Sequence, residues 1–206
     1  MELYLVRHGE SLAQTGADLS DPPLSALGRR QARRLGEALA GVRFDAIFCS
    51  YLTRAVETAA AVAALQAAAP PIRAEALLAE CGAPASFSPC IGAFRAIPQG
   101  LILSGDAGPV CKDDAARAEE CLRRFAYPFV EGEDEPVRSV LIAAHGTFNA
   151  YLFAALIGVK PDLDRVTVSQ GNACVDRFSL YYEQGALRVR LRCLNDLSHL
   201  PPEMRT

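Results

Sequence analysis

The fold is decided by one stretch, Leu3-Tyr4-Leu5-Val6-Arg7-His8-Gly9, in which a short apolar run ends directly in a cation, an imidazole and a glycine. A similar order returns later, where the apolar run Val140–Ala144 is followed by His145 and Gly146. Short apolar runs of this kind are typical of buried parallel strands. Ligands of open α/β sheets bind beyond the carboxyl ends of such strands, so we expect His8 and His145 to face one crevice.

Segments with helical spacing alternate with the apolar runs. This alternation predicts an α/β fold, a three-layer sandwich with a central, mostly parallel sheet flanked by helices. We expect helices after Ser25, from about Thr53 to Ala69, and from about Asp113 to Phe129; strands at Leu3–Val6, Ala46–Cys49, Ile72–Leu78 and Val140–Ala144; and a hairpin of Ala173–Tyr182 with Ala186–Cys193. Helices that start at Gly9 and Gly146 would aim free N–H groups at the crevice.

Length and charge limit the class of protein. With 206 residues, half of them apolar, we expect residues 1–206 to form a single domain around one core. The 21 Lys and Arg residues against 24 Asp and Glu give a net charge of -3, so we expect no nucleic-acid and no membrane partner. Only Lys112 and Lys160 are lysines, and neither follows a Gly-x-x-x-x-Gly pattern, which excludes the usual P-loop.

The cysteines and the apolar runs bear on the compartment. The seven cysteines are odd in number, widely spaced and include no Cys-x-x-Cys pair, which argues against a disulfide framework and a thiolate zinc site. No secretory leader pattern opens the sequence, and it holds no run of 18 apolar residues. We therefore expect reduced thiols in a cytoplasmic protein. The sequence leaves the oligomeric state open.

One segment departs from the alternating pattern. Between Gly82 and Pro109, glycines and prolines are interleaved with large apolar side chains. A long apolar loop in a compact domain is usually functional, so we expect a lid or substrate loop at about residues 82–114. The alternative is a surface excursion that packs on its own small cluster.

The charged side chains near the expected crevice suit a phosphoryl group. Arg7 precedes His8, and Arg54 follows the strand Ala46–Cys49, so both guanidinium groups should reach the same sheet edge as the histidines. A neutral imidazole can attack phosphorus while cations stabilise the equatorial oxygens. The leaving alkoxide needs a proton, and Glu80, just past the strand Ile72–Leu78, is the carboxyl best placed to supply it.

The chain resembles the histidine phosphatase superfamily, which includes the cofactor-dependent phosphoglycerate mutases, in the stretch Leu5-Val6-Arg7-His8-Gly9-Glu10-Ser11. Further similar stretches follow in the family's order: Asp21-x-x-Leu24-Ser25-x-x-Gly28-x-x-Gln31-Ala32, Ser50-x-x-x-Arg54-Ala55-x-x-Thr58-Ala59, Leu78-x-Glu80, Ala144-His145-Gly146, Asn172 and Asn195-Asp196-x-Ser198-His199-Leu200. The likeness covers nearly the whole chain outside Gly82–Asp114.

The resemblance implies roles for individual residues. It makes His8 the nucleophile and Glu80 the acid/base, with Arg7, Arg54 and His145 binding the phosphoryl group. Gln14 stands where many members have an asparagine that contacts the phosphate, so its amide is a further candidate phosphate ligand. The resemblance implies no metal and no cofactor. Thr147 replaces a glycine that is common in the family, and the usual Gly-Glu-Ser ahead of the fourth helix is absent.

The function expected from these residues is that of a metal-independent phosphomonoesterase, which hydrolyses a small phosphorylated metabolite through a phosphohistidine intermediate. A phosphoglycerate mutase-type phosphotransferase is the first alternative. Mutases that the chain resembles have Arg-His-Tyr-Gly after the acidic residue, whereas Cys81-Gly82-Ala83-Pro84 follows Glu80, and Ala13-Gln14 replaces the expected Trp-Asn. Both differences favour the hydrolase. A second alternative is a non-catalytic phospholigand-binding protein, although the two histidines and two arginines are all present. A metal-dependent hydrolase lacks support, since no His-x-His or His-Glu-x-x-His spacing occurs.

Overall fold

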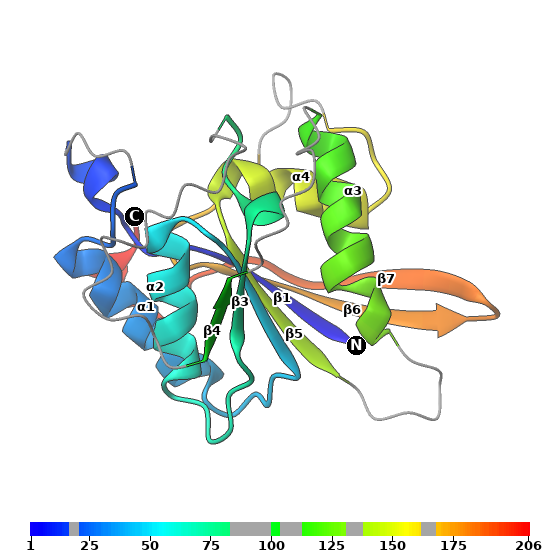
Figure 1. Ribbon diagram of the computed structural model, residues 1–206, viewed down its shortest axis with the longest axis horizontal. Coiled ribbons are helices and arrows are strands. Elements are labelled where there is room, and N and C mark those ends of the chain that lie inside the picture. Colours follow the sequence, from blue (N-terminus) through cyan, green and yellow to red (C-terminus); the bar gives the residue numbers. More distant parts are fainter. Residues whose placement is uncertain (17–20, 83–99, 104–112, 131–137, 162–167) are drawn as a thin grey trace.

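The structure is a computed structural model that describes residues 1–16, 21–82, 100–103, 113–130, 138–161 and 168–206. Its described strands form one seven-stranded sheet in the order β4-β3-β2-β5-β1-β6-β7 (Figure 1). The five strands from β4 to β1 run parallel, whereas β6 and β7 are antiparallel additions at one edge. The strands are β1 (Glu2–Arg7), β2 (Ala46–Ser50), β3 (Ile72–Glu75), β4 (Leu101–Leu103), β5 (Ser139–Ala144), β6 (Val175–Glu183) and β7 (Ala186–Asp196).

Helices cover both faces of this sheet (Figure 1). One face carries α1 (Ala26–Leu39) and α2 (Thr53–Ala63), and the other carries α3 (Asp114–Phe125) and α4 (Gly146–Leu156). The predicted three-layer sandwich with a mostly parallel sheet is therefore confirmed. Short 3-10 turns join these elements: η1 (Leu12–Thr15), η2 (Ala76–Leu78), η4 (Tyr127–Phe129) and η5 (Pro202–Met204). The longest described helix, α1, has 14 residues, and no described helix is long and apolar enough to cross a bilayer.

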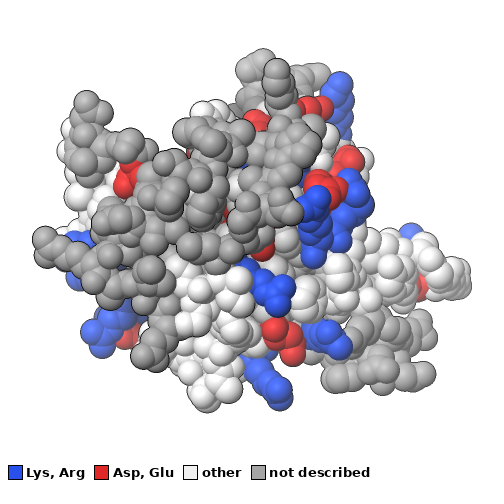
Figure 2. Space-filling view, in the orientation of Figure 1, with Lys and Arg blue, Asp and Glu red and all other residues white. Residues whose placement is uncertain are grey.

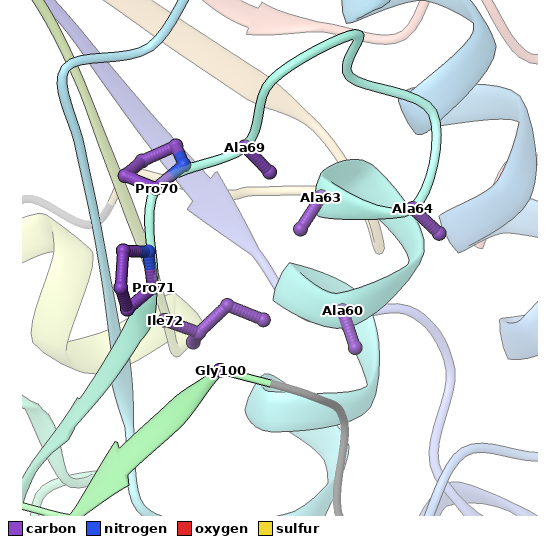
Figure 3. Close-up of a pocket in the computed structure, with 8 residues that line it drawn as sticks. All are labelled: Ala60, Ala63, Ala64, Ala69, Pro70, Pro71, Ile72 and Gly100. Atoms are coloured by element: carbon purple, nitrogen blue, oxygen red, sulfur yellow. The ribbon is translucent and has the colours of Figure 1, made fainter.

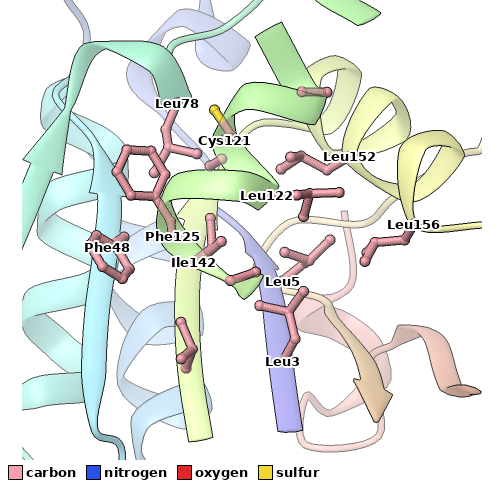
Figure 4. Packing of buried hydrophobic residues seen from close by; sticks show 14 of the residues in the cluster. Leu3, Leu5, Phe48, Leu78, Cys121, Leu122, Phe125, Ile142, Leu152 and Leu156 are labelled. Atoms are coloured by element: carbon pink, nitrogen blue, oxygen red, sulfur yellow. The ribbon is translucent and has the colours of Figure 1, made fainter. Parts of the chain in front are cut away.

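Two apolar cores follow from the alternation of side chains along the central strands. Leu3 and Leu5 of β1 pack with α3 and α4, where Leu122, Phe148 and Leu152 are fully buried (Figure 4). Tyr4 and Val6 point to the opposite face and pack with residues of α1 and α2. Because β1 and β5 lie at the centre of the sheet, their ends are fixed from both sides, and these are the ends that carry the two histidines.

Four predicted elements were wrong in detail. The helix α3 ends at Phe125, four residues earlier than expected, and Tyr127–Phe129 form the separate turn η4. The helix α2 ends at Ala63, six residues earlier than expected, because the chain then turns and Gln66 donates to the carbonyl of Leu39. The strand β3 ends at Glu75, and the three following residues form η2, which lets consecutive side chains be buried. No helix starts at Gly9. Its N–H donates to Oγ1 of Thr58 at 3.1 Å, and the N–H of Glu10 donates to Oε1 of Gln31 at 2.8 Å.

The segment at about residues 82–114 is described only in part. Residues 101–103 form the edge strand β4, which is parallel to β3 and was not predicted. Residues 113 and 114 begin α3, where Asp113 accepts a hydrogen bond from the N–H of Ala115 as the N-cap. The predicted lid or substrate loop itself, at residues 83–99 and 104–112, lies outside the described residues.

On the face shown in Figure 2, basic and acidic groups of the described residues are intermingled. In α3, for example, Glu120 accepts from both Arg123 and Arg124. Exposed pairs of this kind contribute little to stability, so the fold rests on its two apolar cores.

A close backbone contact joins the loop after His8 to the start of α1. A Cβ atom built on Gly28 would lie 1.9 Å from the carbonyl oxygen of Glu10, and one built on Gly9 would lie 2.5 Å from the carbonyl oxygen of Gly28. Neither position has room for a side chain. Glycine is therefore required at both positions by proximity and not by a positive φ angle.

We predict that Gly28→Ala destabilises the protein by at least about 3 kcal/mol, because backbone atoms cannot move aside as a flexible side chain would. Gly41→Ala is the matched control, since nothing lies within 4 Å of its added Cβ. Its free energy of unfolding should stay within about 0.5 kcal/mol of the parent value. Urea denaturation of the three proteins tests this, and similar midpoints for the two variants would contradict it.

Candidate active site

His8 follows β1 directly and is held in one orientation. Its side chain is only 5% exposed. Nδ1 lies 2.7 Å from the carbonyl oxygen of Gly9, which can only accept, so Nδ1 carries the proton. Nε2 then has a free electron pair, and this pair accepts a hydrogen bond from Nε of Arg54 at 3.1 Å. The contacts therefore select the neutral tautomer with its lone pair on Nε2.

The electrostatic surroundings of His8 keep the ring neutral. Burial and the nearby charges of Arg54 and Arg7 lower its pKa to about 3, although the hydrogen bond to Gly9 acts in the opposite direction. Burial is the largest cause, because an imidazolium ion loses its hydration when it is enclosed. At neutral pH the imidazole is therefore unprotonated and able to act as a nucleophile.

His145 meets His8 as expected. It follows β5, serves as the N-cap of α4 and is fully buried. The two rings have centroids 5.1 Å apart and planes inclined by 61°. Burial, followed by the charges of His8 and Arg54, holds the pKa of His145 well below its ordinary value. Among the described residues, neither of its ring nitrogens has a hydrogen-bond partner, so both can serve a ligand.

Arg54 stands in the first turn of α2, and two other side chains set its position. Asp21 accepts from the backbone N–H of Thr53 at 3.0 Å, and lies 4.0 Å from Nη1 of Arg54. Thr58 donates to the carbonyl of Arg54 at 2.8 Å and accepts from the N–H of Gly9. Sequence reasoning gave these two residues no role, although both lie in stretches that resemble the family.

Arg7 approaches the same place from β1. Its Nη1 donates to the carbonyl of Gln170, and its buried Nε has no partner among the described residues. A Cβ on Gly146 would lie 3.3 Å from this Nε, so the glycine leaves room for the guanidinium group. Burial lowers the pKa of Arg7 and of Arg54, and the charge of Glu80 opposes the shift at both. A guanidinium group stays charged in proteins, so two cations face the neutral histidines.

The side chain of Glu80 binds the first turn of α4, the helix that His145 caps. Its Oε1 accepts from the N–H of Phe148 at 3.1 Å and from its neighbour Cys81 at 2.9 Å. Within the described part of the chain, Oε2 makes no hydrogen bond. The half-buried carboxyl group therefore has one oxygen anchored to a helix N-terminus and one oxygen able to exchange a proton.

Gln14 is tied to Asn172 in this structure. Its Nε2 donates to Oδ1 of Asn172 at 3.0 Å, and its Oε1 accepts from Nδ2 of the same residue at 3.2 Å. Asn172 in turn donates to the carbonyl of His8 at 3.1 Å. The amide of Gln14 therefore supports the His8 segment indirectly, and it would have to turn to bind a phosphate.

Within the described residues, neither a cluster of metal ligands nor an apolar hollow beside β3 competes with this site. Among the described residues, no group of three or more His, Cys, Asp or Glu side chains is arranged to hold a metal ion. A hollow of about 320 Å³ opens at the start of β3, between alanines of α2, Pro70 and Pro71 (Figure 3). Its lining has no charged side chain, and it lies at the end of β3 opposite to Glu80, so it cannot serve the histidine pair.

Comparison with known proteins gives the family. The profile of the histidine phosphatase superfamily (branch 1) matches residues 3–85. A 2,3-bisphosphoglycerate-dependent phosphoglycerate mutase 2 from Gloeobacter violaceus is 30% identical over 176 residues, which are 78% of this chain and 77% of that protein. The chain belongs to the histidine phosphatase superfamily. The expected resemblance is therefore confirmed.

Other members of the histidine phosphatase superfamily are similar over different lengths. An adenosylcobalamin/alpha-ribazole phosphatase from Escherichia coli (strain K12) is 45% identical over 62 residues, but this match covers only 29% of the chain and 30% of that enzyme. Among solved structures, a mycobacterial glucosyl-3-phosphoglycerate phosphatase in complex with VO3 superposes with a TM-score of 0.67. It is 27% identical, and the match covers 94% of this chain and 98% of that one. The relatives thus include both phosphatases and mutases.

We predict that the buried His8 makes the free energy of unfolding decrease as the pH is lowered. The unfolded histidine binds a proton near its ordinary pKa of 6.5, whereas the folded one does so only near 3. The stability that the neutral ring contributes is therefore complete above pH 6.5 and is lost as the pH falls toward 3. Relative to His8→Gln, the parent should lose about 2 kcal/mol of unfolding free energy between pH 6.5 and 5. If urea denaturation showed the same pH dependence of the unfolding free energy for the parent and for His8→Gln, the lowered pKa of His8 would be contradicted.

Proposed function

We propose that this protein is a phosphomonoesterase that hydrolyses a small phosphorylated metabolite through a phosphohistidine at His8, without a metal. The observation that carries the proposal is the fixed, neutral imidazole of His8, whose Nε2 lone pair faces the Arg54 guanidinium group at 3.1 Å. A phosphoryl group entering between them would take over the arginine's donors and leave the lone pair free to attack. The phosphatases among the relatives support the same class of reaction.

In the first step Nε2 of His8 forms a bond to phosphorus while the bond from phosphorus to the leaving oxygen breaks. Arg7 and Arg54 neutralise two equatorial oxygens, and an N–H of His145 donates to the third. The leaving alkoxide takes a proton from Oε2 of Glu80. The free alcohol departs. His8 then carries the phosphoryl group on Nε2, and its Nδ1–H still donates a hydrogen bond to the Gly9 carbonyl.

In the second step a water molecule attacks the phosphorus opposite Nε2. The Glu80 carboxylate takes the proton of this water, the bond from phosphorus to Nε2 breaks, and inorganic phosphate is released. His8 returns as the neutral imidazole, and Glu80 again holds its proton. The cycle balances without a cofactor. Residues 82–114, which follow Glu80 along the chain, are the segment we propose to select the substrate.

The similarity to the Gloeobacter violaceus mutase keeps phosphoglycerate mutase activity as a second candidate. The same phosphohistidine would then return its phosphoryl group to a sugar acid and not to water. The two activities are separated by incubation with 3-phosphoglycerate and a trace of 2,3-bisphosphoglycerate. Release of inorganic phosphate alone supports the hydrolase, whereas formation of 2-phosphoglycerate as the main product supports the mutase.

We predict that His8→Ala lowers the hydrolysis of p-nitrophenyl phosphate by about 10⁴-fold or more, because no other group takes over the covalent step. Circular dichroism should show an unchanged fold. His199→Ala is the control, since this residue has no part in the proposed chemistry, and it should retain most of the turnover. The parent enzyme should be equally active before and after EDTA treatment. Activity that EDTA abolishes and a divalent metal restores would contradict the proposal.

We predict that the effect of Glu80→Gln depends on the leaving group. Phenolate is a far stronger base than p-nitrophenolate, so phenyl phosphate needs an acid, whereas p-nitrophenyl phosphate does not. The variant should therefore lose about tenfold to a hundredfold more kcat/KM on phenyl phosphate than on p-nitrophenyl phosphate. Equal losses on both substrates would mean that Glu80 shapes the pocket without transferring a proton.

A further inference from the structure

A buried cation of α3 contacts the chain segment just before Glu80. Arg117 of α3 is only 3% exposed, although sequence reasoning gave it no role. Its Nη1 donates to the carbonyl of Leu77 at 3.0 Å and to that of Ala79 at 2.7 Å. Its Nη2 donates to Oδ1 of Asp114 at 2.6 Å. A buried arginine is costly unless its donors are used. Here Nη1 binds the segment Leu77–Ala79, while Nη2 and Nε pair with Asp114 of the same helix.

Arg117 contacts both the residue before Glu80 and the residue that anchors the Glu80 carboxyl group. Ala79, whose carbonyl it binds, is the residue directly before Glu80. The centre of its guanidinium group also lies 3.9 Å from the ring centroid of Phe148, the residue whose N–H binds Oε1 of Glu80. One side chain therefore fixes the segment that carries the acid and the helix turn that receives it.

The segment that carries Glu80 depends on such a contact. The strand β3 ends at Glu75, and Ala79 follows η2 in an extended conformation, so Glu80 stands beyond the sheet ladder. From α3, only Arg117 and Cys121 contact its carbonyls by hydrogen bonds among the described residues, and the Cys121 thiol donates to Leu77 at 3.3 Å. Leu78 and Cys121 belong to the same buried apolar cluster, part of which is shown in Figure 4. An apolar side chain could fill the same space, but it could not hold two carbonyl oxygens.

We propose that Arg117 is a positioning residue for Glu80, which holds the acid in line with the leaving oxygen by binding the carbonyl of Ala79 and packing on Phe148. This inference rests on the proposed function. A small displacement of an acid costs much of its effect, so loss of Arg117 should impair the reaction where the acid is needed. It should have little effect where the leaving group departs without help.

The test compares kcat/KM for phenyl phosphate with kcat/KM for p-nitrophenyl phosphate on each protein sample. The ratio of the two values does not depend on the fraction of correctly folded enzyme, so partial unfolding cannot imitate the effect. Arg117→Met, which keeps an apolar chain against Phe148, should lower this ratio about tenfold. Arg124→Met is the control, because Arg124 lies on the same helix with an exposed ion pair to Glu120, and it should leave the ratio unchanged.

Two further variants make the result specific. Arg117→Lys keeps a charged donor near the two carbonyls and should recover part of the ratio, and it provides the test if Arg117→Met does not fold. In the Glu80→Gln background, Arg117→Met should lower the ratio no further, because the group that it positions is already inactive.

The outcomes separate this inference from the proposed function. If Glu80→Gln lowers the ratio and neither Arg117 variant does, Arg117 has only a structural role and the inference is overturned alone. A further fall in the ratio when Arg117→Met is added to Glu80→Gln also overturns it. If Glu80→Gln itself leaves the ratio unchanged, the acid role of Glu80 and this inference fail together, while the phosphohistidine at His8 stands or falls by its own test. If the parent hydrolyses neither substrate, the proposed function fails as well.

Discussion

The hydrogen bond from Nε of Arg54 to Nε2 of His8 is the contact on which the rest of the site depends. It can exist only if the imidazole is neutral and its proton is on Nδ1, where the carbonyl of Gly9 accepts it. Burial disfavours the protonated ring. The carbonyl of Gly9 selects the tautomer that has its proton on Nδ1. A side chain that is ordinarily half protonated near pH 6.5 is thereby kept neutral.

The sheet explains why these groups meet. The strands β1, β5 and β2 are adjacent and parallel, so the residues that follow them lie along one edge. Arg7 and His8 leave the first strand, His145 leaves the second, and Arg54 begins the helix after the third. The cores on both faces hold these strands in place. Apolar packing elsewhere thus offsets the free-energy cost of burying these four side chains together.

The sequence predicted the parts of the site that follow from strand ends. Each histidine follows an apolar run that forms a buried parallel strand, and the carboxyl ends of such strands share one edge of the sheet. The prediction that His8 and His145 lie together was therefore correct. The role of Gly9 was misread, because its close contact with Gly28 joins residues far apart in the chain. The burial of Arg117 could not be foreseen for the same reason. In a helix rich in charges, an arginine is expected to face solvent unless its distant partners are known.

The most direct test of the account is to trap the phosphorylated enzyme. The protein is mixed with p-nitrophenyl phosphate, quenched in alkali within the first turnover, digested and examined by mass spectrometry. The account predicts one phosphoryl group on the peptide that contains His8, stable to alkali and lost in brief acid, and absent from His8→Ala. Phosphate on any other residue, or turnover with no phosphorylated enzyme at any time, would contradict it.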